Sequence, residues 1–157
     1  MAHTFSDILI HVIFSTKGRQ PTIHETFRFR LYEYLGGIAR KEFGAALKIG
    51  GTEDHIHGLL RLRTGVSVAE AMRKWKSLSS AWIHKKATDS GGFAWQSGYG
   101  AFSVSGPRKA KVIEYIDRQV EHHRTVTFEE EFLAFLDRYE VGYDPGNVWG
   151  DGPVSEA

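Results

Sequence analysis

Two stretches of this chain alternate apolar and polar residues so regularly that they restrict its fold more than any other feature. In residues 6–17 the even positions from 8 to 14 are all apolar, and in residues 55–63 the even positions from 56 to 62 are apolar or glycine. Successive side chains of a strand point to opposite faces of a sheet. Each stretch therefore predicts a strand with one face in a core and a more polar opposite face.

The remaining segments predict an α+β fold. Apolar spacing and turn residues indicate long helices at 23–43 and 67–86 and short strand regions at 46–50 and 93–103. They also indicate two later helices, at 107–123 and 127–140. Thr127 and Glu130 form a capping box at the start of the last helix. The order β-α-β-β-α-β is typical of a split βαβ sandwich of the ferredoxin-like or RRM-like kind.

We therefore expect an antiparallel sheet with helices on one face, an open second face, and a tyrosine-bearing helix toward the C-terminus. Residues 1–143 would form one catalytic domain, and residues 144–157, which are punctuated by glycine and proline, a flexible tail.

Composition excludes several classes of protein. The chain has no cysteine, which rules out disulfides, zinc–thiolate sites and thiol catalysis and agrees with a cytoplasmic location. No apolar run approaches the roughly 20 residues that cross a membrane, and the N-terminal segment lacks the pattern of a signal peptide. The net charge is only +1, so any nucleic-acid surface has to be local.

Two histidines form the first candidate site. His55 and His57 alternate with the apolar residues of the strand at 55–63, so both project from its polar face. Their side chains are rooted roughly 7 Å apart, close enough to converge on one metal ion. Asp54 precedes them and is interpreted as a turn residue, the alternative being a hydrogen-bond partner of the pair.

A helix carries the second candidate site. Tyr115 lies on the flank of its apolar stripe, with Arg108 and Lys111 before it and Gln119 one turn after it. Neighbouring cations favour the phenolate form that a tyrosine nucleophile needs. The Gln119 carbonyl oxygen is a candidate third metal ligand. His122 and His123 are interpreted as an exposed helix end.

Positive charge gathers in one stretch, from residue 72 to residue 88, which contains no acidic residue. The acidic run Glu129–Glu131 comes much later and balances the total charge. Phosphate-contacting residues are expected in that stretch, on the histidine strand and on the tyrosine helix, namely Arg61, Arg63, Arg73, Lys74, Lys76, Lys85, Lys86, Arg108 and Lys111.

Both motifs together resemble the single-tyrosine HUH transposases, small insertion-sequence enzymes that act on single-stranded DNA. The HUH motif (histidine, bulky apolar residue, histidine) reads His55-Ile56-His57 within GGTEDHIHGLL, and the Tyr-x-x-x-Gln pattern of the helix is matched by Tyr115 and Gln119. The segments ILIHVIFSTKGRQP, WQSGYGAFSVS and EHHRTVTFEEEFLAFL are also similar. The resemblance covers residues 5–143. Domesticated REP-associated tyrosine transposases share this signature.

This resemblance implies a DNA transposase with Tyr115 as nucleophile and His55, His57 and Gln119 as ligands of Mg²⁺ or Mn²⁺. The enzyme would cleave and rejoin single-stranded DNA at hairpin-containing element ends through a 5′-phosphotyrosine intermediate. The resemblance also implies a homodimer in which the tyrosine helix of one subunit can complete the site of the other, an arrangement that the sequence fits but does not require, with neither a membrane partner nor a nucleotide cofactor.

Two other classes of protein are alternatives to a transposase. An RRM-like binding module would stack bases on sheet aromatics, but its K/R-G-F/Y-G/A-F signature is absent. A histidine-dependent nucleotide hydrolase needs a further histidine that this strand lacks. Trp95 could stack on a base, although a core position is favoured. His11 could lie near the metal, although a buried core position is favoured there too.

Overall fold

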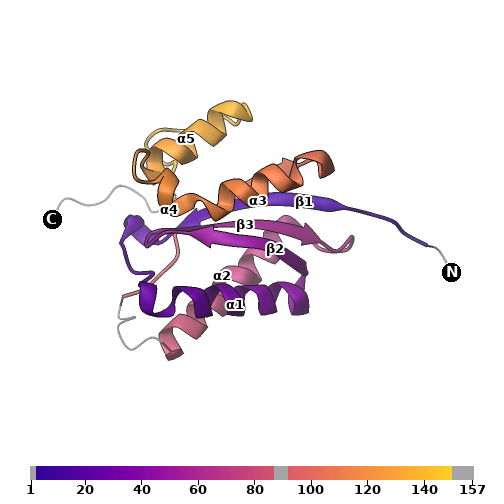
Figure 1. The fold of residues 1–157 in the computed structure, drawn as a ribbon, viewed down its shortest axis with the longest axis horizontal. Coiled ribbons are helices and arrows are strands. Elements are labelled where there is room, and N and C mark those ends of the chain that lie inside the picture. The colour runs from indigo at the N-terminus through magenta and orange to yellow at the C-terminus, as the bar shows by residue number, and fades with distance from the viewer. Residues whose placement is uncertain (1–2, 87–91, 150–157) are drawn as a thin grey trace.

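A four-stranded antiparallel sheet forms the middle layer of the molecule (Figure 1). The computed structural model describes residues 3–86 and 92–149. The strands follow the order β2-β3-β1-β4 and span Ile8–Ser15 (β1), Gly44–Gly51 (β2), His55–Leu62 (β3) and Gly100–Val104 (β4). Ile13 of β1 lies opposite His57 of β3, so the HUH strand is central in the sheet.

Helices α1 (Glu25–Glu42) and α2 (Val68–Lys86) cover one face of this sheet. The core between them contains the even-numbered apolar residues of β1 and β3, as the alternation predicted, except Ile8, which is exposed at the start of β1. Trp75 of α2 is fully buried there and lies over Gly58, where a Cβ atom would come within 2.5 Å of the indole. Trp95 is buried in the same core.

The C-terminal helices cover the opposite face. These are α3 (Lys109–Asp117), α4 (Gln119–His122) and α5 (Phe128–Arg138), which lie above the sheet in Figure 1. Short 3₁₀ turns at Lys17–Arg19 (η1) and Gly106–Arg108 (η2) complete the described elements. The expected α+β fold class is confirmed, but the sheet face that the sequence left open lies under these helices.

A close approach of backbones places α3 on the sheet. A Cβ atom at Gly50 would lie 2.4 Å from the carbonyl oxygen of Ile116, so only glycine allows α3 to lie this near β2. Ile116 is fully buried against Leu9 and Leu59. This contact fixes the height of the tyrosine helix above the strand that carries the histidines.

The predicted helix at 107–123 is interrupted. Arg118 leaves helical geometry, with φ −98° and ψ 20°, and separates α3 from α4. By contrast, α5 begins as its capping box predicts, because Thr127 Oγ1 accepts a hydrogen bond from the Glu130 amide at 3.2 Å.

The beginning of the predicted tail packs on the domain. Trp149 contacts Phe128 and Phe132, and its ring lies 5.0 Å from the Arg19 guanidinium. Residues 150–157 lie outside the described part of the chain. No described helix combines the length and the apolar character needed to cross a membrane.

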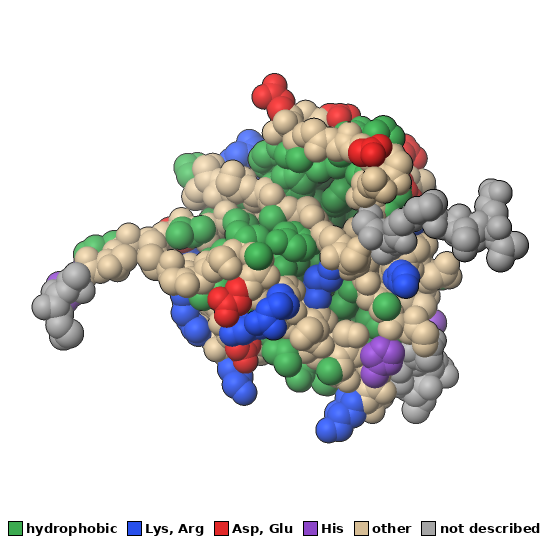
Figure 2. Space-filling view, turned by 180° about the vertical axis from the view of Figure 1, so that it is seen from behind, with side chains coloured by type: hydrophobic (Ala, Val, Ile, Leu, Met, Phe, Trp, Pro, Cys, Tyr) green, Lys and Arg blue, Asp and Glu red, His purple; other side chains and the backbone are tan. Residues whose placement is uncertain are grey.

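Charge differs between the two helical layers. Figure 2, seen from behind, has acidic side chains along the top, on the α5 side, whereas most of its lysines and arginines lie in the lower part, toward α1 and α2. The balanced total charge therefore conceals an uneven distribution.

Candidate active site

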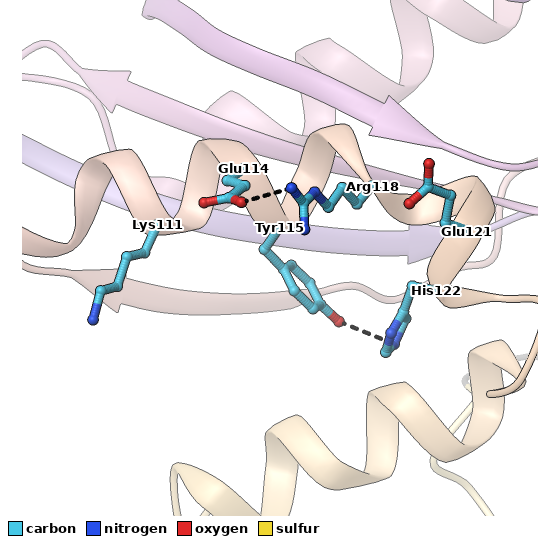
Figure 3. Close-up of a pocket in the computed structure, with 6 residues that line it drawn as sticks. All are labelled: Lys111, Glu114, Tyr115, Arg118, Glu121 and His122. Atoms are coloured by element: carbon cyan, nitrogen blue, oxygen red, sulfur yellow. Dashed lines mark hydrogen bonds and ion pairs between the residues drawn. The ribbon is translucent and has the colours of Figure 1, made fainter.

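Tyr115 lies on α3 and points from that helix toward α5 (Figure 3). The centroid of its ring is 5.8 Å from that of His57 and 6.0 Å from that of His11. Its hydroxyl donates a hydrogen bond to Glu131 Oε2 and lies 3.5 Å from His122 Nε2. The structure thus brings the predicted tyrosine beside the histidine strand within one chain.

The surroundings of the Tyr115 hydroxyl differ from those expected. Burial, and then the negative charge of Glu131 and the hydrogen bond to it, raise the pKa of this hydroxyl well above its ordinary value. The group is therefore a protonated donor at neutral pH. The expectation that cations hold it as a phenolate is wrong for this arrangement, because the group it contacts is a carboxylate.

A groove of about 450 Å³ opens beside the tyrosine ring (Figure 3). Its lining comes from α3, α4 and the residue between them, and consists of Lys111, Glu114, Tyr115, Arg118, Glu121 and His122. Glu114 and Arg118 form an ion pair at 3.0 Å. Lys111 and Arg118 are cations that can contact a phosphate, and Glu114 and Glu121 in the same lining balance their charge.

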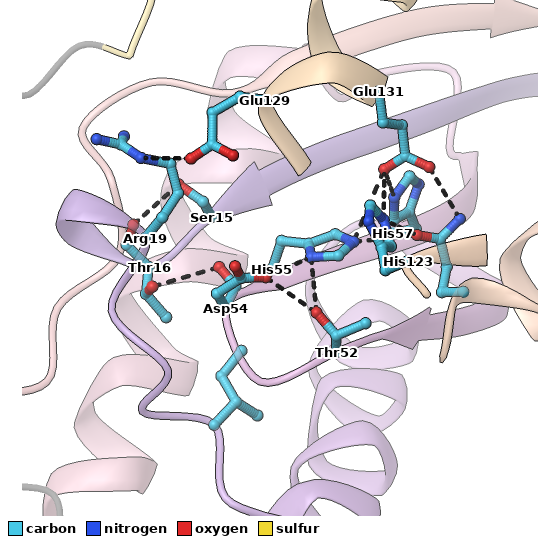
Figure 4. A network of polar contacts seen from close by, with 12 residues as sticks. Ser15, Thr16, Arg19, Thr52, Asp54, His55, His57, His123, Glu129 and Glu131 are labelled. Atoms are coloured by element: carbon cyan, nitrogen blue, oxygen red, sulfur yellow. Dashed lines mark hydrogen bonds and ion pairs between the residues drawn. The ribbon is translucent and has the colours of Figure 1, made fainter. Parts of the chain in front are cut away.

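His55 is held by an acidic partner (Figure 4). Its Nδ1 lies 2.7 Å from Asp54 Oδ1 and 2.9 Å from Thr52 Oγ1. Hydrogen bonding to His55 and Thr52 outweighs burial and lowers the pKa of Asp54, so this carboxylate is an acceptor and Nδ1 carries the proton. The Nε2 lone pair then faces Gln119. Asp54 is a histidine partner as well as a turn residue, so the preferred turn-only interpretation is wrong.

His57 lies between two other side chains. Its Nδ1 is 2.7 Å from His11 Nε2, and its Nε2 is 2.8 Å from Glu131 Oε1. Burial lowers the pKa of His57 to about 4, although Glu131 opposes that shift. His11 is buried too, and burial followed by the charge of His57 lowers its pKa. His11 is therefore a core histidine that also orients one member of the HUH pair.

Sequence reasoning missed two residues of this cluster. Glu131 of α5 is buried beneath the helix instead of belonging to an exposed acidic run. His123 is mostly buried, with Nδ1 2.6 Å from the Val126 carbonyl oxygen and Nε2 3.1 Å from Glu131 Oε1. The sequence places Glu131 and His123 near the capping box of α5, but a capping box does not predict which face of a helix packs on the sheet.

The charges of these two groups depend on each other. Burial alone would raise the pKa of Glu131, but hydrogen bonds from His123 and His57 outweigh burial and hold it well below its usual range. Burial alone would lower the pKa of His123, yet the hydrogen bond and charge of Glu131 leave that pKa raised. The carboxylate is ionised and needs a cationic partner.

The donor atoms of this cluster fit a divalent cation. One ligand-type atom each from His55, His57, His123 and Glu131 lies within 4.8 Å of the others. Gln119 Oε1 adjoins them, 3.0 Å from His55 Nε2 and 2.9 Å from His123 Nε2. With the Asp54 carboxylate beside Nδ1, the His55 Nε2 lone pair and the Gln119 Oε1 atom, 3.0 Å apart, can be neighbouring ligands of one cation. Imidazole nitrogen and hard oxygen donors suit Mn²⁺ and similar ions.

The predicted basic residues divide between the two layers. Five lie on α2, across the sheet from Tyr115, namely Arg73, Lys74, Lys76, Lys85 and Lys86. Lys76 Nζ donates to the carbonyl oxygens of Gln96 and Gly98, and Lys74 pairs with Glu42 at 3.3 Å. At least two of these cations therefore have partners within the chain.

The other four lie closer to the tyrosine helix or on β3 and the loop after it. Arg61 Nε lies 2.8 Å from Asp7 Oδ1, and Arg63 donates to the carbonyl oxygen of Arg40. Arg108 ends η2, directly before α3. Lys111 is the one predicted residue of the nine that lines the groove beside Tyr115.

Paired histidines on a central strand, with a tyrosine helix laid across them, define the class of single-tyrosine HUH transposases. The chain matches the family described as "Transposase IS200 like" over residues 4–119. It belongs to the IS200-like transposase family, and the resemblance to single-tyrosine HUH transposases is confirmed. No significant match was found among curated proteins.

Two solved structures share the fold. One is a protein from Deinococcus radiodurans R1 assigned as a transposase, with a TM-score of 0.58 and 22% identity, covering 76% of this chain and 95% of that one. The other is a REP-associated tyrosine transposase bound to a REP hairpin, with a TM-score of 0.59 and 13% identity, covering 80% of this chain and 74% of that one. At these sequence identities the similarity shows a shared fold alone.

Proposed function

We propose that this protein cleaves and rejoins single-stranded DNA at hairpin-containing element ends, with Tyr115 as nucleophile and a divalent metal ion as cofactor. The observation that carries the proposal is the approach of Tyr115 to His57, with ring centroids 5.8 Å apart, in the fold of an IS200-like transposase. A phenol beside two buried imidazoles and an amide oxygen supplies the groups needed for phosphoryl transfer.

His55, His57 and Gln119 would hold the metal, which we propose to be Mg²⁺ or Mn²⁺. When bound, the ion would polarise a non-bridging phosphate oxygen and stabilise the charge of the transferring group. Asp54 and His11 would keep the two imidazole rings oriented, because each bonds the ring nitrogen that faces away from the cluster.

The Tyr115 oxygen would attack phosphorus in line. A new bond from that oxygen to phosphorus forms while the bond to the 3′ oxygen breaks, leaving a 5′-phosphotyrosine and a free 3′-hydroxyl. The phenol gives up its proton as the bond to phosphorus forms and the departing 3′ oxygen takes up one, so no proton is gained or lost overall. Glu131 Oε2 and His122 Nε2 are the groups beside the hydroxyl. A 3′-hydroxyl of another strand can then reverse the step and rejoin DNA without ATP.

The groove beside Tyr115 would hold the strand that is cut. Lys111, Arg118 and His122 would contact its phosphates, and Arg108 and Arg61 would extend this track toward the start of α3. The basic residues of α2 lie across the sheet and would meet only DNA that passes around the molecule. A REP hairpin is the ligand of the REP-associated structural relative, which supports a hairpin as the substrate.

We also propose that Tyr115 acts on the metal site of its own chain. The family resemblance implied a homodimer and left open whether Tyr115 acts on its own chain or on that of a partner. The contacts of Tyr115 with Glu131 and with the rings of His57 and His11, all within one chain, support a site that is complete without a partner.

Two alternative functions have different support from the structure. A domesticated REP-associated enzyme would use the same site, and the fold likeness to such a protein favours it as a second candidate. A non-catalytic RRM-like module would need an exposed sheet face to stack bases. In this chain α3 and α5 occupy that face, which argues against the module.

Tyr115→Phe tests the proposal. We expect loss of cleavage of hairpin-bearing single-stranded DNA and of the covalent adduct, with DNA affinity within a few-fold of wild type, because only the nucleophilic oxygen is removed. Tyr34→Phe is the matched control, since Tyr34 stacks on Trp82 in the opposite layer. Chelation with EDTA should stop cleavage and added Mn²⁺ should restore it. Cleavage by Tyr115→Phe at the wild-type rate would refute the assignment.

A further inference from the structure

Helix α5 contributes one acidic side chain to the interior of the site. Glu131 is 3% exposed, although its neighbours Glu129 and Glu130 face outward. Phe128 and Phe132 pack beside it in a buried aromatic cluster, and Thr127 caps the helix, so the position of Glu131 is fixed by its surroundings. The family match ends at Gln119, so this helix lies outside the matched region.

The two carboxylate oxygens of Glu131 face two different groups of residues. Oε1 lies among the imidazoles, 2.8 Å from His57 Nε2, 3.1 Å from His123 Nε2 and 3.7 Å from His55 Nε2. Figure 4 shows these rings gathered below the carboxylate.

Oε2 faces the nucleophile instead. It accepts hydrogen bonds from the Tyr115 hydroxyl and from Gln119 Nε2, the latter at 3.1 Å, and lies 3.2 Å from His122 Nε2. One rigidly held carboxylate therefore contacts both the candidate metal ligands and the phenol.

The donor atoms around Oε1 suit a cation. A buried carboxylate is costly unless cations or hydrogen-bond donors satisfy it, and Oε1 lies among three imidazole nitrogens. Imidazole and carboxylate ligands are those that divalent transition metals take together. An ion held by His55 and His57 would thus find Oε1 within the same cluster of donors, all within 4.8 Å of one another.

We infer that Glu131 is a further ligand of the metal through Oε1 and positions the Tyr115 hydroxyl through Oε2. This inference rests on the proposed metal-dependent function and adds to it a ligand from α5, with the imidazole of His123 beside it in the cluster. With Glu131 added, the set would be two imidazole nitrogens, the Gln119 amide oxygen and a carboxylate oxygen, and because imidazole nitrogen suits Mn²⁺ better than Mg²⁺, we expect the site to prefer Mn²⁺.

The test compares Glu131→Gln with Glu130→Gln in the full-length protein. Glu130 is exposed, and glutamine preserves its role in the capping box. Titration calorimetry with Mn²⁺ alone should give at least tenfold weaker binding for Glu131→Gln and wild-type binding for Glu130→Gln. Unchanged Mn²⁺ affinity in Glu131→Gln would overturn the ligand role.

A spectroscopic measurement addresses the positioning role. With 3-fluorotyrosine incorporated at position 115, the ¹⁹F resonance of the metal-free protein should shift in Glu131→Gln and stay unchanged in Glu130→Gln. An unmoved resonance in Glu131→Gln would overturn the positioning role. If Glu131→Gln does not fold, Glu131→Asp replaces it in both measurements, because its shorter carboxylate cannot reach both groups; unchanged Mn²⁺ affinity and an unmoved resonance in Glu131→Asp would then contradict the inference.

Cleavage assays separate this inference from the proposed function. If wild type and Glu130→Gln bind Mn²⁺ but form no adduct with hairpin DNA, the proposed function fails. If both cleave DNA and Glu131→Gln binds Mn²⁺ as they do, only the role of Glu131 fails.

Discussion

At the scale of single residues, hydrogen-bond partners decide which nitrogen of each histidine can serve the site. Asp54 lies 2.7 Å from His55 Nδ1, so Nε2 is left with its lone pair toward Gln119. A histidine without that partner could equally present the other tautomer. The carboxylate directly before the HUH motif is thus part of the metal-binding chemistry that we propose.

We expect Asp54→Asn to weaken Mn²⁺ binding by roughly ten- to a hundredfold, the usual cost of removing the partner of a metal-binding histidine. The amide still fits the turn, so the melting temperature should change little. Calorimetry with Mn²⁺ measures the effect, and Glu53→Gln, an exposed neighbouring change, is the control. Equal affinities of the two variants would show that Asp54 does not support the site.

The buried His57 makes the metal-free protein sensitive to acid. Burial lowers its pKa from the ordinary 6.5 of a histidine to about 4 in the folded state. Between these values the unfolded chain binds a proton that the folded chain does not, so stability falls as the pH falls from 6.5 toward 4. The loss from His57 alone is on the order of 3 kcal/mol over that window.

Urea unfolding in EDTA at several pH values checks this prediction. His57→Asn removes the titrating group, so the dependence of its unfolding free energy on pH between 4 and 6.5 should be shallower than that of wild type. Parallel curves for the two proteins would mean that His57 is not the group responsible.

At the scale of elements, the position of α3 on the sheet depends on one glycine. We expect Gly50→Ala to lower stability by about 1–3 kcal/mol, because its Cβ would lie 2.4 Å from the carbonyl oxygen of Ile116. The displaced helix would also move Tyr115, and a shift of about 1 Å can cost roughly a hundredfold in rate. Thermal unfolding and single-turnover cleavage measure the two effects.

Gly36→Ala is the matched control, because Gly36 lies within α1 and an added Cβ there meets only the end of the Arg40 side chain, at 3.6 Å. Alanine in a helix is more stable than glycine by roughly 0.5–1 kcal/mol. This variant should therefore gain stability and cleave normally. A Gly50→Ala protein that behaves in the same way would contradict the proposed role of the close contact.

The helices and strands also show how much of the structure could be predicted from the sequence. Alternation predicted β1 and β3, and helical spacing predicted α1 and α2, because these patterns depend on neighbours a few residues away. The same local reasoning singled out His55, His57, Tyr115 and Gln119 as candidates, and the family resemblance supplied their predicted roles. It missed Glu131, which contacts His57 across 74 residues, because the sequence pattern of α5 does not reveal which face docks on the sheet.

The break at Arg118 has the same explanation. Every residue from 107 to 123 is compatible with one continuous helix, so sequence spacing predicts no interruption. The packing of Ile116 on one side and the burial of Gln119 on the other belong to tertiary structure. Those long-range contacts set the orientation of the two functional side chains relative to each other.

At the scale of the whole molecule, the sheet separates two surfaces. The layer of α3, α4 and α5 contains the candidate active site, and α2 on the other side carries most of the predicted basic residues. We therefore expect Lys85→Gln with Lys86→Gln to leave the cleavage rate of a short hairpin substrate nearly unchanged. Lys111→Gln should slow cleavage at least tenfold, because Lys111 lines the groove beside Tyr115. Equal losses in the two proteins would contradict this division.

A single chain contains every group that the proposed reaction needs, so two differently inactivated chains should not restore activity to each other. Tyr115→Phe and His57→Ala chains, co-expressed with two different tags and purified through both, would isolate any mixed dimer. If Tyr115 acts within its own chain, each subunit lacks one required group and no 5′-phosphotyrosine adduct forms. If tyrosines are exchanged between subunits, Tyr115 of the His57→Ala chain meets intact histidines, and an adduct on that chain would overturn the single-chain site.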